Sequence, residues 1–158
     1  MLKWLWLSGL VVVLDQASKL FMASWLSLYE TVPVIPFFNL TMAHNTGAAF
    51  SFLAQAGGWQ RWFFVVLTFV ITVGLIVWLK RLQTDAKLEA ISISMILGGA
   101  IGNVIDRLFY GYVIDFLDVY YGTYHWPAFN IADSAIVIGA ALLIIDSFIG
   151  KSTTQEQK

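Results

Sequence analysis

The side chains best suited to chemistry in this sequence are aspartates that belong to separate parts of an otherwise apolar chain. Asp115 and Asp133 form the natural pair, because a short loop can bring them together at one end of the apolar segments. Two carboxyl groups within hydrogen-bond reach cannot both ionise cheaply, so they share one proton. The ionised carboxyl can then take a proton from water while the protonated carboxyl polarises a carbonyl group. The pair therefore predicts aspartic-protease chemistry, for which we expect neither a metal nor a cofactor.

The sequence lacks the residues that other hydrolytic mechanisms require. The chain has no cysteine, which excludes thiolate catalysis, disulfides and cysteine-based metal sites. His44 and His125 are the only histidines, too few for a three-histidine zinc site. The sequence contains neither a G-x-S-x-G nor an H-E-x-x-H motif, so it carries no nucleophile elbow and no zinc-protease helix.

The composition places this chemistry in a membrane. The 158 residues are 59% hydrophobic and 12% charged, with a mean hydropathy of +0.75. A soluble chain of this length could not bury so much apolar surface, because small domains have little interior relative to their surface. The net charge of −1 and the pI of about 6.0 offer no electrostatic basis for binding nucleic acid.

The apolar runs predict an all-α integral membrane protein, formed as a single membrane-embedded domain over residues 1–158. A helix needs about 20 mostly apolar residues to cross the hydrocarbon core. Four segments meet this requirement: about 4–25, 62–79, 88–109 and 131–149. Two long connections, 27–60 and 110–130, contain all three prolines, and we expect the short tail 151–158 to be flexible.

Basic residues predict the orientation of these helices. Positively charged residues favour the cytoplasmic side of a membrane. One side of the predicted bundle collects Lys3, Lys80, Arg81, Lys87, Lys151 and Lys158, whereas the other boundary has only Arg61 and Arg107. Both termini are therefore expected in the cytoplasm, and both long connections outside it.

Polar residues within the apolar segments collect at one depth, near the predicted extracytoplasmic surface. Ionisable groups inside a bilayer are costly, so each one is a functional candidate. At 1.5 Å per residue, all four predicted helices or their outer connections contribute polar groups to this level: Asp15, Lys19, Asn45, Asn103, Asp106, Arg107, Asp115 and Asp133. Asp146 is the exception, because it lies at the opposite boundary.

Several of these residues also have a purely structural interpretation. Asp15 and Lys19 are four residues apart on one helix face and can form a packing ion pair. Asp106 and Arg107 can form an interfacial pair whose side chains extend toward water. Asp118 and Asp146 are most simply boundary residues with solvent access.

The start of the last helix is open to a structural interpretation as well. Asn130 can cap this helix, and Asp133 lies in its first turn, where the helix dipole favours negative charge. Gly98 and Gly102 form a small-xxx-small face for close helix contact. A rival function, a proton-coupled transporter or channel, would need titratable groups through the full membrane thickness, and the segment 62–79 carries none.

Five motifs together resemble the bacterial lipoprotein signal peptidase family, signal peptidase II. They cover nearly the whole chain in order, as Asp15-Gln16-Ala17-Ser18-Lys19, Asn45-Thr46-Gly47-Ala48-Ala49-Phe50-Ser51, Gly98-Gly99-Ala100-Ile101-Gly102-Asn103-Val104-Ile105-Asp106-Arg107, Val113-Ile114-Asp115-Phe116 and Phe129-Asn130-Ile131-Ala132-Asp133-Ser134-Ala135. Each motif is weak alone, but the ordered set is highly specific.

The resemblance implies a membrane aspartyl endopeptidase of the bacterial inner membrane. Such enzymes cut diacylglyceryl-modified prolipoproteins before the lipidated cysteine and are inhibited by the cyclic peptide globomycin. The family's catalytic pair corresponds to Asp115 and Asp133. Substrate-binding or site-supporting positions correspond to Asp15, Lys19, Asn45, Gly47, Asn103, Asp106, Arg107 and Asn130. The first outer connection is expected to form a small β-like cradle, with a loop over the site, and membrane lipids are expected to contact the helices.

Overall fold

Four long helices and one small antiparallel sheet make up the computed structural model, which describes residues 1–47 and 57–155. The helices are α1 (Leu5–Trp25), preceded by the 3₁₀ turn η1 (Leu2–Trp4), α2 (Gln60–Arg81), α3 (Lys87–Phe109) and α4 (Ile131–Gln155). The strands are β1 (Thr31–Ile35), β2 (Phe38–Asn45), β3 (Val113–Tyr121) and β4 (Tyr124–His125). The four helices are long and apolar enough to cross a membrane, which confirms the predicted helical membrane architecture.

Helix α3 lies at the centre of the bundle and packs against α1, α2 and α4. Its glycines allow this close contact. A Cβ on Gly98 would lie 2.8 Å from the carbonyl oxygen of Ser8, and one on Gly102 would lie 2.6 Å from Asp15 Oδ2. Both glycines therefore face α1, as the small-xxx-small pattern predicts. On α4, a Cβ on Gly139 would lie 2.7 Å from the Ser92 carbonyl oxygen of α3.

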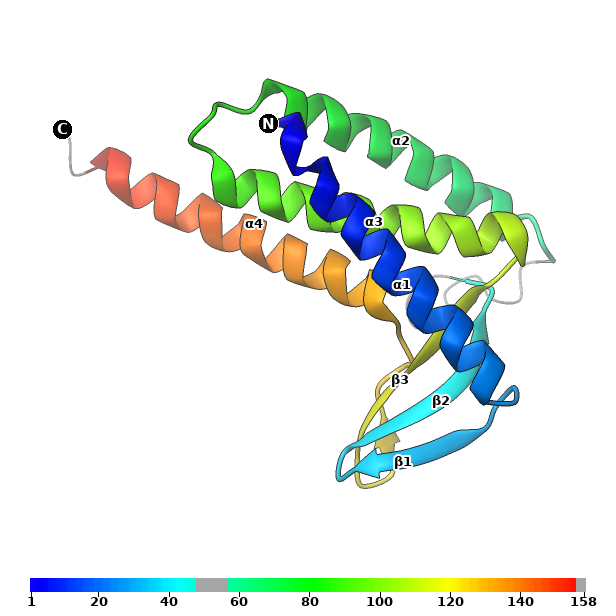
Figure 1. Ribbon diagram of the computed structural model, residues 1–158. Coiled ribbons are helices and arrows are strands. Elements are labelled where there is room, and N and C mark those ends of the chain that lie inside the picture. The colour runs from blue at the N-terminus through cyan, green and yellow to red at the C-terminus, as the bar shows by residue number, and fades with distance from the viewer. Residues whose placement is uncertain (48–56, 156–158) are drawn as a thin grey trace.

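The sheet has the strand order β1-β2-β3-β4 and projects from one end of the bundle, opposite the N-terminus and the α2–α3 connection (Figure 1). Its inner face packs on the end of α1 through Met22, Leu26, Met42, Ile114 and Phe116. This buried apolar cluster fixes the sheet relative to the helices, because displacing it would expose apolar surface to water.

The sheet and the end of α4 differ from the sequence-based expectation. The β-like cradle was expected in the first outer connection, but β3, the longest strand, and β4 come from the second connection. The buried run Val113–Phe116 explains this difference, because these residues complete the apolar cluster under α1. Helix α4 continues to Gln155, beyond the predicted end of the last helix at about residue 149.

Candidate active site

The two candidate catalytic aspartates line one cleft of about 850 Å³ where the sheet meets the bundle. Asp115 lies on β3 and Asp133 in the first turn of α4. Asn45, Asn103 and Arg107 line the same cleft, and Ile136, Val137 and Ile138 form an apolar wall along α4. The structure therefore brings together carboxyl, amide and guanidinium groups from β2, β3, α3 and α4, at the end of a predominantly apolar bundle.

Asn130 links the two aspartates. Its Nδ2 atom donates to Asp115 Oδ1 at 2.7 Å, and its Oδ1 atom accepts from the backbone N–H of Asp133 at 2.9 Å. Asn130 is thus the helix cap that its position predicted, and it also holds a carboxylate. One fully buried amide side chain therefore sets the start of α4 and the orientation of Asp115 at the same time.

Asp115 accepts a second amide donor, and Asp133 accepts an amide donor of its own. Asn45 Nδ2 donates to Asp115 Oδ2 at 3.1 Å, and Asn103 Nδ2 donates to Asp133 Oδ1 at 2.7 Å. Burial raises the pKa of Asp115 to about 7, and the charge of Asp133 acts in the same direction. The hydrogen bonds from Asn45 and Asn130 and the charge of Lys19 lower that pKa. Asp115 therefore titrates near neutral pH, as a shared-proton pair requires.

Behind the cleft, a buried charge network holds Asn103 in place. Lys19 Nζ lies 2.8 Å from Asp15 Oδ2 and 3.0 Å from Asp106 Oδ2, and it donates to Asn103 Oδ1 at 3.0 Å. Lys19 is 1% exposed, and Asp15 and Asp106 are fully buried. Because Asn103 Oδ1 accepts from Lys19, its Nδ2 group is the end that faces Asp133.

This network also ties the helices to the sheet and to α4. Asp15 Oδ1 accepts from the backbone N–H of Ala132 at 2.9 Å, and Asp106 Oδ2 accepts from that of Ile114 at 3.0 Å. The expected ion pair of Asp15 and Lys19 is present. The suggested pair of Asp106 and Arg107 was wrong, because consecutive helix residues point in different directions and Asp106 turns toward Lys19.

Arg107 instead reaches across the cleft to the first outer connection. Its Nη2 atom donates to the carbonyl oxygen of Gly47 at 2.7 Å, and its guanidinium lies 5.0 Å from the Phe64 ring centre. Gly47 N–H donates in turn to Asn45 Oδ1 at 3.0 Å, so these contacts position Asn45. The remaining motif residues, Ala48 to Ser51, and the expected loop over the site lie outside the described residues.

Two polar residues were missed or misjudged from the sequence. Gln16 donates to Asp106 Oδ1 at 2.8 Å and to the Gly102 carbonyl oxygen at 3.2 Å; its place beside Asp15 in an apolar span was the available signal. Asp118 was expected to have solvent access, but it is 7% exposed. It accepts a hydrogen bond from Asn39 instead, and its Oδ1 atom lies 2.9 Å from His125 Nδ1.

Comparison with known proteins assigns the family. The family model described as signal peptidase (SPase) II matches residues 7–149. The chain belongs to the signal peptidase II family. The lipoprotein signal peptidase of Alteromonas mediterranea is 58% identical over 147 residues, which cover 93% of this chain and 81% of that protein. The enzyme of the same name from Photorhabdus laumondii is 55% identical, over 94% and 89% of the two chains.

Solved structures agree with this assignment. A bacterial membrane enzyme aligns with a TM-score of 0.83 and 32% sequence identity, over 99% of this chain and 93% of that one. A second aligns with a TM-score of 0.77 and 35% identity, over 90% of each chain. Signal peptidase II is an aspartic-type peptidase family, so the chain is a membrane peptidase of that type, and the transporter alternative receives no support.

Proposed function

We propose that this signal peptidase II removes signal peptides from diacylglyceryl-modified prolipoproteins by cutting before the lipidated cysteine, with Asp115 and Asp133 as the catalytic pair. The observation that carries the proposal is the placement of these two carboxyl groups in one cleft, joined through the buried side chain of Asn130. Within residues 1–47 and 57–155, neither carboxylate has a charged partner as near as those of Asp15 and Asp106, whose oxygens lie within 3.0 Å of Lys19 Nζ.

The proposed mechanism requires one proton shared by the pair. The ionised carboxylate takes a proton from a water molecule, and the resulting hydroxide attacks the scissile carbonyl carbon, which the protonated carboxyl polarises. The C–N bond then breaks as the carboxyl pair returns the proton taken from water to the nitrogen, which leaves as the free amino group of the lipidated cysteine. Water is the only co-reactant, so the chemistry needs no metal ion and no cofactor.

The remaining polar groups of the cleft are proposed to bind the substrate backbone. Arg107 Nε is buried without a hydrogen-bond partner in the described part of the chain, so it remains available to donate to a peptide carbonyl group. Asn45 lies beside Asp115 and can contact the same backbone. The apolar wall formed by Ile136, Val137 and Ile138 suits the lipid or the apolar end of the signal peptide. Asp15, Lys19 and Asp106 support this site from behind.

This function also implies a location. The bond to be cut lies close to a lipid anchor, so the carboxyl groups belong at a membrane boundary. We place the protein in the bacterial inner membrane as a multi-pass protein with lipid around its helices, both termini in the cytoplasm and the cleft near the extracytoplasmic surface. Globomycin, a cyclic peptide that mimics a substrate, would occupy the cleft.

The test uses purified protein in detergent and a lipidated prolipoprotein, with cleavage followed as a gel shift. Asp115→Asn and Asp133→Asn should each reduce the rate by at least about 10²-fold, the usual contribution of a general acid or base. Globomycin should block cleavage by the unmodified enzyme. Asp146→Asn, at the opposite end of α4, is the control and should retain most activity. Substantial cleavage by either cleft variant would rule out the proposed pair.

A further inference from the structure

A second cavity of about 570 Å³ lies on the sheet beside the catalytic cleft. Its lining consists of Thr31, Thr41, Ala43, Asp118, His125, Trp126, Pro127 and Ala128. We refer to it as the sheet groove. Ala43, Trp126, Pro127 and Ala128 line both the groove and the cleft, so the two spaces adjoin and share a wall.

An irregularity in β3 brings Asp118 into this groove. The backbone N–H groups of Phe116 and Leu117 both donate to the carbonyl oxygen of Phe129, at 3.0 and 2.8 Å. The pairing of β2 with β3 also shifts here, with the extra residue on β2 between Leu40 and Ala43, so that Asp115 lies opposite Ala43 and Asp118 opposite Asn39. Residues three apart would point to opposite faces of a regular strand. The bulge redirects them, and Asp115 lines the cleft while Asp118 lines the adjoining groove.

Built-in hydrogen bonds hold the polar wall of the groove. Asn39 Nδ2 donates to Asp118 Oδ2 at 2.8 Å, and His125 Nδ1 lies 2.9 Å from Asp118 Oδ1. Thr31 and Thr41 place their hydroxyl oxygens 2.9 Å apart across β1 and β2. These contacts fix the side chains before any ligand arrives, which lowers the entropic cost of binding one.

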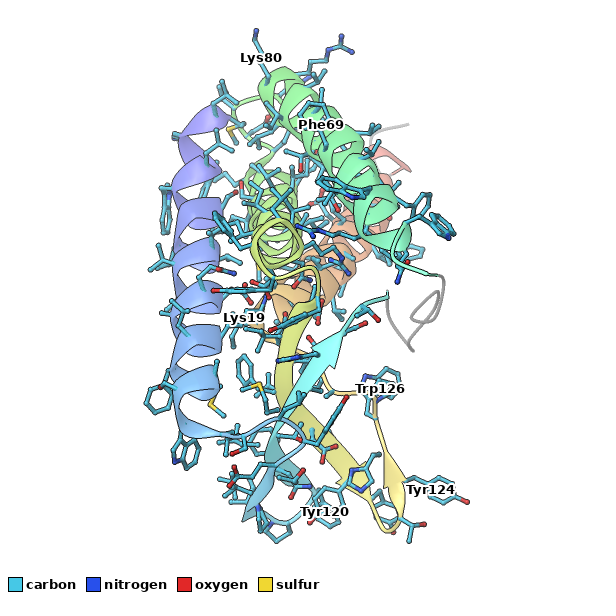
Figure 2. All side chains as sticks on the ribbon, turned by 90° about the vertical axis from the view of Figure 1, so that its right-hand side faces the viewer. Lys19, Phe69, Lys80, Tyr120, Tyr124 and Trp126 are labelled. Atoms are coloured by element: carbon cyan, nitrogen blue, oxygen red, sulfur yellow. The ribbon has the colours of Figure 1, made fainter. Side chains whose placement is uncertain are left out.

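The cleft and the groove differ in chemistry and in direction. The cleft has the aliphatic wall of α4, whereas the groove presents hydroxyl, carboxyl and imidazole groups. Trp126 lies between the helices and the far end of the sheet, where Tyr120 and Tyr124 lie (Figure 2). A chain that leaves the catalytic cleft through the groove therefore moves away from the membrane-spanning helices and from apolar to polar surroundings.

We propose that the sheet groove binds the polar segment of the substrate that follows the cleaved bond. This inference rests on the proposed peptidase function, whose substrate has an apolar part before the cut and a water-exposed polypeptide after it. An extended segment in the groove places its backbone amides against the hydroxyl groups of Thr31 and Thr41. The groove thereby makes cleavage depend on residues beyond the lipidated cysteine.

The first experiment compares two lipidated peptides, one ending as an amide at the cysteine and one continuing for four polar residues. The unmodified enzyme should cleave the longer peptide with a kcat/KM about fivefold to tenfold higher, as expected for one or two added hydrogen bonds. Thr31→Trp fills the groove and should bring the kcat/KM values of the longer and shorter peptides close to each other, with a ratio near one. Thr123→Trp, at an exposed position on the same sheet outside the groove, should retain the preference.

The second experiment measures proximity and does not depend on turnover. Because the chain has no cysteine, Thr31→Cys and Thr123→Cys can be introduced separately into the Asp115→Asn variant. A longer peptide with a haloacetyl group on its third residue after the cut should cross-link to Cys at position 31 and not at position 123.

The outcomes separate the two proposals. Cleavage of neither peptide by the unmodified enzyme would reject the peptidase function itself. Cleavage of both with equal kcat/KM, a length preference that survives Thr31→Trp, or equal cross-linking at both positions would reject the groove while leaving the catalytic pair in place.

Discussion

Asn103 shows how single residues determine the chemistry of this site. Its carboxamide is held by Lys19 on one side and donates to Asp133 on the other. The orientation of that amide therefore depends on a cation whose two carboxylate partners come from different helices. At the scale of individual residues, the candidate site consists of two carboxyl groups proposed for the reaction and a separate buried ion network that orients Asn103.

The pKa of Asp115 predicts the pH dependence of cleavage. Its value of about 7 means that Asp115 holds a proton in acid and loses it as the pH rises through neutrality. The proposed reaction needs one proton on the pair, so loss of the Asp115 proton should lower kcat/KM on the alkaline side with a midpoint near pH 7. Asn45→Ala removes a hydrogen bond that lowers this pKa, so the midpoint should move to higher pH.

A kinetic pH profile measures this shift. Asn39→Ala provides the matched control, because Asn39 lies on the same strand but donates to Asp118 instead of Asp115. Its alkaline midpoint should stay where it is in the unmodified enzyme. A midpoint shift to lower pH in Asn45→Ala would contradict the assignment of this limb to Asp115.

Lys19 is expected to act as a positioning and stabilising residue. Lys19→Met leaves the buried carboxylates of Asp15 and Asp106 without their cation, and breaking a buried pair from one side costs about 3–5 kcal/mol. Chemical or thermal unfolding in detergent measures this loss. Lys3→Met, at an exposed lysine in the first turn of the chain, should change the free energy of unfolding by less than about 0.5 kcal/mol. Similar losses in both variants would refute the role of the network.

At the scale of elements, α3 determines how closely the other helices approach. Its glycines face α1 and α4 at distances that leave no room for a methyl group. The carboxylate of Asp15 lies directly against Gly102, so helix packing and the ion network depend on the same contact. The elements that carry the two proposed catalytic aspartates, β3 and α4, are both hydrogen-bonded to this α1–α3 pair through Asp106 and Asp15.

Two glycine substitutions should therefore have opposite effects. In Gly102→Ala the new Cβ would lie 2.6 Å from Asp15 Oδ2 and 3.3 Å from Ala132 Cβ, which should cost about 1–3 kcal/mol and reduce activity. Gly74→Ala on α2 meets nothing within 4 Å and should be neutral or stabilising by up to about 1 kcal/mol. Unfolding in detergent compares the two, and a stabilised Gly102→Ala would show that this contact does not limit packing.

For the whole molecule, the two ends of the bundle differ in chemistry. The sheet and the cleft occupy one end, while the N-terminus, Lys80 and the α2–α3 connection occupy the other (Figures 1 and 2). The lateral surface of α2 is apolar and exposed, with Phe69 at 66% and Val66 at 60% exposure. This surface suits contact with lipid and leaves the polar ends for water.

The proposed orientation can be tested with single cysteines in this cysteine-free chain. Thr123 in the β3–β4 turn and Thr84 in the α2–α3 connection are both exposed. In intact cells, a membrane-impermeant maleimide should label Thr123→Cys, because the sheet faces outward. Thr84→Cys should be labelled only after the membrane is disrupted. The reverse pattern would invert the orientation inferred from the basic residues.

Much of this arrangement was predictable from the residues themselves. Apolar runs of membrane-spanning length determine the four helices, and the cost of burying charge makes the depth of each aspartate informative. Span length and depth are local properties, because the helix rise per residue converts a position in the sequence directly into a depth in the membrane. The ion pair of Asp15 and Lys19 was predictable for the same reason, since residues four apart along a helix lie on one face.

The remaining contacts depended on how the helices rotate against one another and on the register of the strands, which no local sequence pattern specifies. Whether Asp106 meets Lys19 depends on how α3 turns against α1 around Gly98 and Gly102. Whether Asp118 faces water or the groove depends on one irregular pairing in β3. Long-range packing decided both, because a buried carboxylate must find donors wherever the assembled fold offers them.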